Sequence, residues 1–304
     1  MSEPVTIKRG TEIELEIESL AYGGMGLARI ENFVIFVKYA IPGQKVLARI
    51  YKKRKGYAEA QVLETLVESP NAVDVCCKHY WICSKIQSLS YDEQIKEKSS
   101  QVEDAFVRLG GFLNFKLDKV QKANLIYHYR NKMEFTFSPN RWVLESEPEG
   151  VDKSFALGLH IPGRFDKILD IHNCHIQPEI GNKILAVARE VCLANPELRP
   201  YDPRSHIGFL RFLMLRFGVN TGDLMVNVVT SYHDIDKLSP LTDLLLEKFP
   251  EITSLVNNVN TRKADVAFGE YETLLYGKPF IQEKIGDLTF EISANSFFQT
   301  NTTQ

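Results

Sequence analysis

Six cationic side chains lie within a stretch of eleven residues, with Tyr51 among them and Tyr57 just after them. The cations are Lys45, Arg49, Lys52, Lys53, Arg54 and Lys55. Cations bind phosphates and release counterions, and aromatic rings stack on unpaired bases, so this pattern favours an RNA-binding edge. A lysine-rich turn that keeps a hairpin in solution accounts for the charges equally well, because residues 1–64 carry ten basic and eight acidic side chains.

A second basic pattern follows around Lys132, in a strand predicted from Ile126 to Ser138. Arg130, Lys132 and Glu134 alternate with an opposite set that is mostly apolar: Asn131, Met133, Phe135 and Phe137. Successive strand residues point to opposite faces, so the two cations would share one face and could line a phosphate backbone. An exposed face that carries an Arg–Glu or Lys–Glu pair is the simpler interpretation, and the pattern alone favours it.

Five cysteines are the third feature, and three of them, Cys76, Cys77 and Cys83, lie close together in the chain. With Cys174 they supply four thiols, the number that an iron–sulfur cluster or a zinc ion takes. Adjacent side chains of extended backbone diverge, so Cys76 and Cys77 are poor partners for one metal, and His79 or His175 could replace a sulfur. Ordinary reduced cysteines remain an equal alternative. Cys192 lies in a helical pattern and is expected to fill a core.

The elements that would position these residues predict an α+β protein. Residues 1–66 read as an OB-like barrel, because Ile13, Leu15 and Ile17 alternate with glutamates and a hairpin places the basic run at its tip. Residues 67–292 read as a central α+β domain with helices at 179–194 and 235–249. A further helix is expected from Asp92, with apolar residues on one side from Ile95 to Leu109 and an end at Gly110-Gly111. Residues 293–304 read as the start of a further domain.

Composition narrows the function classes. The chain has 304 residues, a net charge of -3 and 44% hydrophobic residues, which excludes a disordered chain and requires any RNA surface to be local. No apolar stretch is long enough for a membrane span, and the start lacks a secretory signal. We therefore expect a cytoplasmic protein that does not associate with a membrane. No obligate protein partner is evident.

Several motifs, in order along the chain, resemble the RNA (uracil-5-)-methyltransferases, in particular the type that makes 5-methyluridine in 23S ribosomal RNA. The N-terminal part is similar to that family's TRAM domain, and later segments are similar to its central domain and to its entry into the methyltransferase domain. The motifs are Ala21–Ile30, Phe36-Val37, Ile41–Gln44, Ser69-Pro70, Tyr129–Phe135, Gly158–Ile171, Cys174–Gln177 and Ser296–Asn301.

The resemblance implies an enzyme that binds RNA and transfers a methyl group from S-adenosylmethionine to carbon 5 of a flipped-out uridine after a cysteine thiolate adds to carbon 6. Gln299 matches the family's glutamine at the methyl-donor site. The nucleophile and the base would lie beyond Gln304, so the sequence predicts no catalytic residue here. The expected fold is therefore a barrel and a central domain whose Rossmann-like methyltransferase domain is absent, a truncated and inactive chain.

The resemblance also implies a 4Fe–4S cluster. Cys77 and Cys83 fit the first pair of the family's cluster motif and Cys174 fits its fourth ligand, but Ile86 occupies the third position. In an alternative alignment two residues are missing after Cys83, so that Cys83 takes the third place and the second ligand is absent. Three other functions stay open: a non-enzymatic RNA-binding protein, a transfer-RNA uracil-5-methyltransferase, and a protein whose metal is the functional centre.

Overall fold

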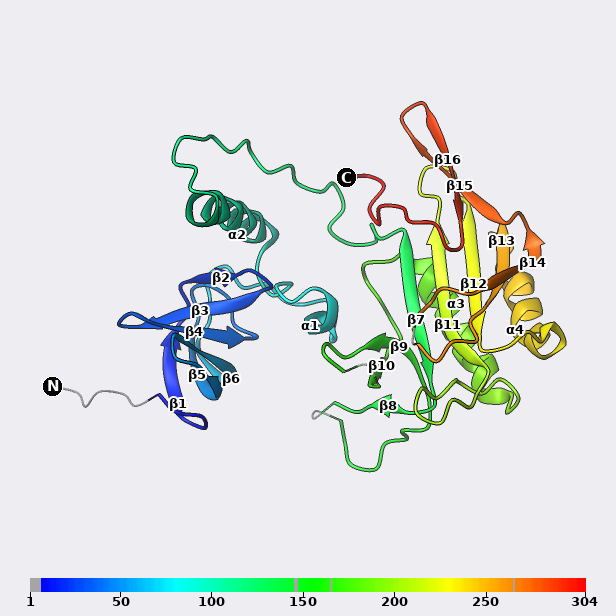
Figure 1. Ribbon diagram of the computed structural model, residues 1–304, viewed down its shortest axis with the longest axis horizontal. Coiled ribbons are helices and arrows are strands. Elements are labelled where there is room, and N and C mark those ends of the chain that lie inside the picture. Colours follow the sequence, from blue (N-terminus) through cyan, green and yellow to red (C-terminus); the bar gives the residue numbers. More distant parts are fainter. Residues whose placement is uncertain (1–6, 145–146, 165, 265) are drawn as a thin grey trace. The chain divides into compact units, whose positions relative to one another are not determined.

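The computed structural model describes residues 7–144, 147–164, 166–264 and 266–304. Residues 1–6 of the predicted barrel domain and Phe165 of the Gly158–Ile171 motif lie outside this part. The chain divides into two compact units, Met1–Lys122 and Ala123–Gln304 (Figure 1). The domain boundaries drawn from the sequence at residues 66 and 292 stay predictions.

The first unit contains a six-stranded sheet in the order β1-β5-β6-β4-β3-β2. Its pairs are antiparallel except β4–β6, which is parallel. The strands are β1 (Glu12–Glu16), β2 (Ser19–Ala21), β3 (Met25–Ile30), β4 (Phe33–Lys38), β5 (Lys45–Lys53) and β6 (Tyr57–Val67).

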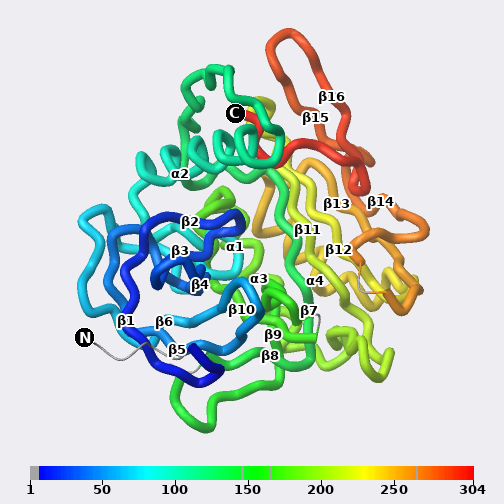
Figure 2. Tube along the Cα trace, turned by 60° about the vertical axis from the view of Figure 1, so that its left-hand side comes forward, coloured from blue at the N-terminus to red at the C-terminus, as the bar shows by residue number. Residues whose placement is uncertain are grey.

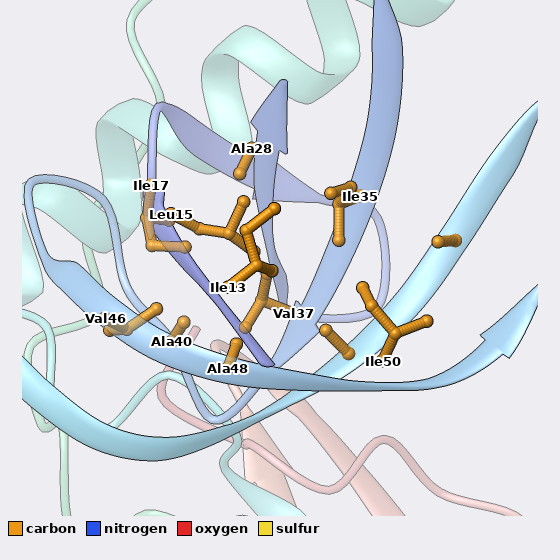
Figure 3. Packing of buried hydrophobic residues seen from close by; sticks show 12 residues of the cluster. Ile13, Leu15, Ile17, Ala28, Ile35, Val37, Ala40, Val46, Ala48 and Ile50 are labelled. Atoms are coloured by element: carbon orange, nitrogen blue, oxygen red, sulfur yellow. The ribbon is translucent and has the colours of Figure 1, made fainter. Parts of the chain in front are cut away.

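Alternation of side chains builds this unit's core. Ile13 and Leu15 point inward from β1, and they pack with residues such as Ile35 and Ile50 of other strands (Figure 3). The intervening glutamates face solvent, where Glu12 pairs with Arg49 of the neighbouring strand at 2.6 Å. Burial of the apolar set at about 25 cal/mol per Å² drives the sheet to curl around it.

Two helices and a single π-helical turn follow the sheet. They are α1 (Tyr80–Cys83), α2 (Tyr91–Asp104) and η1 (Ala105–Leu109). The predicted helical face from Ile95 to Leu109 thus runs through α2 and η1 and ends at Gly110. A Cβ on Gly110 would lie 2.8 Å from the carbonyl oxygen of Phe106, so glycine suits this position.

The second unit is built on an eight-stranded mixed sheet in the order β14-β13-β12-β11-β7-β9-β10-β8. Its strands are β7 (Lys132–Ser138), β8 (Arg141–Trp142), β9 (Ala156–His160), β10 (Ile168–Asp170), β11 (Leu210–Phe217), β12 (Leu224–Thr230), β13 (Ser254–Val259) and β14 (Tyr271–Gly277). Strands β11 and β12 are buried along their whole length, as their mostly apolar sequences favour.

Helices α3 (Glu179–Ala194) and α4 (Ile235–Lys248) lie behind the sheet in Figure 1. Arg189 of α3 is almost fully buried and donates to the Asp170 carboxylate at 2.8 Å and to the Leu157 carbonyl at 3.2 Å. This buried, charge-assisted hydrogen bond therefore holds the helix against β9 and β10. Cys192 is also buried in α3, as the helical pattern predicts.

A hairpin of β15 (Phe280–Ile285) and β16 (Leu288–Ser293) extends past the end of the sheet (Figures 1 and 2). Its base is anchored by Ile281 and Ile292, which pack on Met225 and Val256 of the sheet. Among the described residues, no helix has the length and apolar character needed to cross a bilayer. The cytoplasmic location stays a prediction.

Candidate functional sites

Residues 52–55, here called the basic tip, lie at the turn between β5 and β6. One of their four cations is already paired. Lys52 stands opposite Glu59 in the strand register and forms an ion pair with it. Tyr51 donates its hydroxyl to the same carboxylate at 2.9 Å. The hydrogen bond from Lys52 is the main reason that the pKa of Glu59 is lowered. Lys52 is therefore partly neutralised before any ligand binds.

The other three cations of the tip, Lys53, Arg54 and Lys55, are exposed. The Lys53 ammonium donates to the carbonyl oxygen of Ile7 at 2.8 Å, and the backbone N–H of Arg54 closes the turn on the Tyr57 carbonyl at 2.8 Å. The backbone of the turn is thus fixed while the side chains of Arg54 and Lys55 reach solvent. This arrangement suits contact with a phosphate backbone.

The second basic pattern lies at the start of β7. Asn131, Met133, Phe135 and Phe137 are buried, whereas Lys132 is half-buried and Glu134 is exposed. Lys132 forms an ion pair with Glu134, and the Arg130 guanidinium donates to the Lys132 carbonyl at 2.9 Å. The strand face has the paired character that the pattern alone favours. A role of Arg130 and Lys132 in RNA binding stays a prediction.

Residues 294–302, here called the anchored segment, are held against the ends of β7 and β11. Arg216 is 3% exposed and donates to the Ala294 carbonyl at 3.0 Å and to the Ser296 carbonyl. The Asn131 side chain donates to the Gln299 carbonyl and to the Thr302 hydroxyl, both at 2.8 Å. Burial lowers the pKa of the Arg216 guanidinium, and the negative charge of Glu134 partly offsets this effect.

Glu283 of β15 is the second anchor of this segment. Its buried carboxylate accepts hydrogen bonds from the backbone N–H groups of Val219 and Asn220, at 2.7 and 2.9 Å, and from the Thr302 hydroxyl at 2.9 Å. One carboxylate thus joins the turn after β11, the hairpin and the anchored segment. The backbone at Gln299 is fixed, and its side chain is exposed.

Sequence reasoning missed Arg216, Asn131 and Glu283 as positioning residues. A signal was present for Arg216, because an arginine inside an otherwise apolar, fully buried strand must find acceptors for its charge. Glu283 gave no such signal, since its burial depends on a hairpin whose first strand the sequence pattern did not reveal.

The structure gives no support for the expected metal site on the cysteines. Cys77 is buried and Cys83 is exposed, and the exposed Cys76 has its sulfur 3.7 Å from the Gln87 side-chain oxygen. Burial raises the pKa of the Cys174 thiol, which disfavours the thiolate that a metal needs. Within the described ranges no group of three or more His, Cys, Asp or Glu side chains is placed to hold a metal ion. The 4Fe–4S cluster on Cys76, Cys77, Cys83 and Cys174 is therefore not supported.

Comparison with known proteins agrees with the predicted TRAM domain. Residues 7–63 match the family model of the TRAM domain. An uncharacterized RNA methyltransferase of Porphyromonas gingivalis is 38% identical over 300 residues, which cover 95% of this chain and 64% of that protein. One of Chlorobaculum tepidum is 42% identical over 86% of this chain and 56% of its own length. The chain thus spans less than two thirds of the length of these curated relatives.

The fold itself has a counterpart among solved structures. The Pyrococcus abyssi tRNA (uracil-54, C5)-methyltransferase in complex with S-adenosyl-L-homocysteine matches with a TM-score of 0.68 and 23% identity, over 95% of this chain and 62% of that one. The chain accordingly shares its fold with a nucleic-acid-modifying methyltransferase. Its N-terminal part thus matches the TRAM domain, and most of the chain is similar to proteins named RNA methyltransferases.

This match corrects one expectation. The sequence was interpreted as a fold whose methyltransferase domain is absent, since the family's nucleophile and base would lie beyond Gln304. That interpretation is wrong, because the fold of a solved methyltransferase accounts for 95% of this chain. The truncation and the inactivity that followed from it are likewise not supported.

Proposed function

We propose that this protein is an RNA methyltransferase that transfers the methyl group of S-adenosylmethionine to carbon 5 of uridine, with 23S ribosomal RNA as its substrate. The observation that carries the proposal is the similarity to proteins named RNA methyltransferases across 95% of the chain. The TRAM match supports RNA as the partner. The shared fold with a methyltransferase solved with S-adenosyl-L-homocysteine supports the methyl donor.

The described residues supply binding and positioning for this chemistry. S-adenosylmethionine, when bound, supplies an electrophilic methyl group. Asn131 and Arg216 hold the backbone of the anchored segment, and the exposed Gln299 side chain is proposed to contact the donor. A fixed backbone limits the entropy that Gln299 would lose on binding.

The basic tip is proposed to hold RNA through its phosphates. Replacing both Arg54 and Lys55 with alanine is expected to reduce the slope of log K against log salt by about 1.4 for single-stranded RNA, because each lost phosphate contact removes about 0.7. Fluorescence anisotropy over a salt series measures this slope. The matched control replaces Lys183 and Lys248, two exposed lysines of α3 and α4. Equal slopes for both double variants would contradict a role of the tip.

Loss of the gene tests the proposed reaction directly. Deletion is expected to remove 5-methyluridine from purified 23S ribosomal RNA, and expression of the gene from a plasmid is expected to restore it. Mass spectrometry of nucleosides from separated ribosomal and transfer RNA measures both pools. Loss of 5-methyluridine from transfer RNA alone would indicate that transfer RNA is the substrate. Unchanged 5-methyluridine in both pools would refute the methyltransferase proposal.

A further inference from the structure

Two cavities open at the end of the second unit's sheet that lies opposite the anchored segment, and Tyr201 lines both. The first, here the basic cavity, has a volume of about 370 Å³ and lies beside the end of β7 and the start of β11. The second, here the aromatic cavity, has a volume of about 640 Å³ and is lined by residues between Pro196 and Lys263. The seven residues of β7 separate this end from the anchored segment by about 20 Å.

The basic cavity carries an excess of positive charge. Two carboxylates, Asp166 and Asp202, face five cations: Arg141, Lys153, Lys167, Arg204 and Arg211. Asp166 pairs with Arg204, and the hydrogen bond from Arg204 is the main reason that its pKa is lowered. Arg141 also pairs with Glu147 at 2.6 Å, so five cations stand against three carboxylates. The cavity keeps a net positive charge, and an anion such as a phosphate suits it.

The aromatic cavity presents a supported ring. Tyr232 is 43% exposed, and its ring packs on Phe209 with a centroid distance of 4.9 Å. The Lys237 ammonium donates to the Tyr232 hydroxyl at 3.1 Å, which fixes the ring. Ile207, which is 69% exposed, also lines the cavity, as do the exposed cations Arg199 and Lys263. A flat, partly open ring edged by cations suits an unpaired base.

The loop from Tyr201 to Gly208 lies between the two cavities and is held in place. The Tyr201 ring lies 4.3 Å from the Arg211 guanidinium, and its hydroxyl is 3.0 Å from Nδ1 of His206. The Asp202 carboxylate accepts from the backbone N–H of Arg204 at 3.0 Å. Because the loop is already ordered, a ligand that spans both cavities would lose little free energy in ordering it.

We infer that these cavities form a second RNA contact, in which the aromatic cavity stacks an unpaired base on Tyr232 and the basic cavity holds the adjoining phosphate. The inference rests on the proposed function for the identity of the nucleic acid. The contact lies about 20 Å from Gln299 along β7, so it would bind a nucleotide other than the one beside the methyl donor. It would recognise a single-stranded part of the substrate, since a paired base cannot stack on a side chain.

The test uses the full chain, a fluorescently labelled single-stranded hexauridine and a duplex RNA of matched charge. Replacing Tyr232 with alanine is expected to weaken hexauridine binding about 5- to 100-fold, the range for loss of one stacked base, and to leave duplex binding unchanged. Tyr232→Phe keeps the ring and is expected to bind like the wild type. The matched control, Tyr276→Ala, removes a ring that is 50% exposed on β14. Circular dichroism confirms that each variant is folded.

Each outcome separates this inference from the proposed function. Wild-type protein that binds neither RNA would refute RNA binding as a whole. If Tyr232→Ala binds hexauridine with the same affinity as the wild type, the second contact alone is refuted. Equal losses for Tyr232→Ala and Tyr276→Ala, or competition by poly-glutamate as strong as that by RNA, would also overturn it, because neither fits a site that stacks a base.

Discussion

Replacing Glu283 with alanine is expected to lower the free energy of unfolding of the second unit by about 3 kcal/mol. The carboxylate is fully buried and accepts from the backbone N–H groups of Val219 and Asn220 and from the Thr302 hydroxyl. Alanine would leave these donors without an acceptor, and each unsatisfied buried group costs about 1–3 kcal/mol. For a unit of this size, the midpoint of thermal unfolding would fall by about 6–12 °C.

Two further variants sharpen this prediction. Glu283→Gln keeps the size of the side chain and one acceptor oxygen, so it is expected to cost about 1–2 kcal/mol. Glu291→Ala removes an exposed glutamate from the neighbouring strand β16 and is expected to change stability by less than about 0.5 kcal/mol. Thermal unfolding together with hydrogen exchange on peptides from residues 123–304 measures the effects. A loss for Glu291→Ala as large as that for Glu283→Ala would show that the hairpin, rather than the carboxylate, is responsible.

Replacing Gly208 with alanine is expected to cost about 4 kcal/mol and to disturb the loop between the two cavities. The residue has a φ of +124°, where an L side chain is strained, and its added Cβ would lie 2.1 Å from the Pro200 carbonyl oxygen. Backbone strain costs about 1–3 kcal/mol, and forced overlap in a packed region costs a similar amount. Urea unfolding measures the total.

The matched control for this change is Gly222→Ala. Gly222 also has a positive φ, +79°, but no atom lies within 4 Å of an added Cβ. It therefore isolates the backbone strain, which we expect at about 1 kcal/mol. If both variants lose the same stability, the close approach to Pro200 contributes nothing and the loop is looser than its geometry indicates.

Long, periodic elements were predictable from the sequence, and short or locally irregular ones were not. The apolar pattern predicts a helix at 179–194, the observed bounds of α3, because its stripe is both long and buried. The strand pattern before Ser138 was expected to begin at Ile126, yet β7 begins at Lys132. Residues 128–131 bond instead to the anchored segment and to the segment around Cys174, contacts that no local pattern encodes.

The candidate sites show the same division. The cations of the basic tip could be read from the sequence, but the pairing of Lys52 with Glu59 depends on the register of β5 and β6, which shifts between Ile50 and Lys52. Cysteine spacing predicted a metal site, whereas the thiols differ in burial, and the described residues contain no group of three or more side chains placed to hold a metal ion. The sequence shows which side chains could bind a ligand, whereas tertiary packing determines which of these side chains come into contact.

The hydrogen bonds from Asn131 to Gln299 and Thr302 join residues that are 168 and 171 positions apart. Contacts of such long range close late, because the intervening chain must be ordered first. During synthesis on the ribosome, Asn131 can form these hydrogen bonds only after almost the whole second unit has emerged. The maturation of this unit is thereby tied to the arrival of the peptide that carries Gln299.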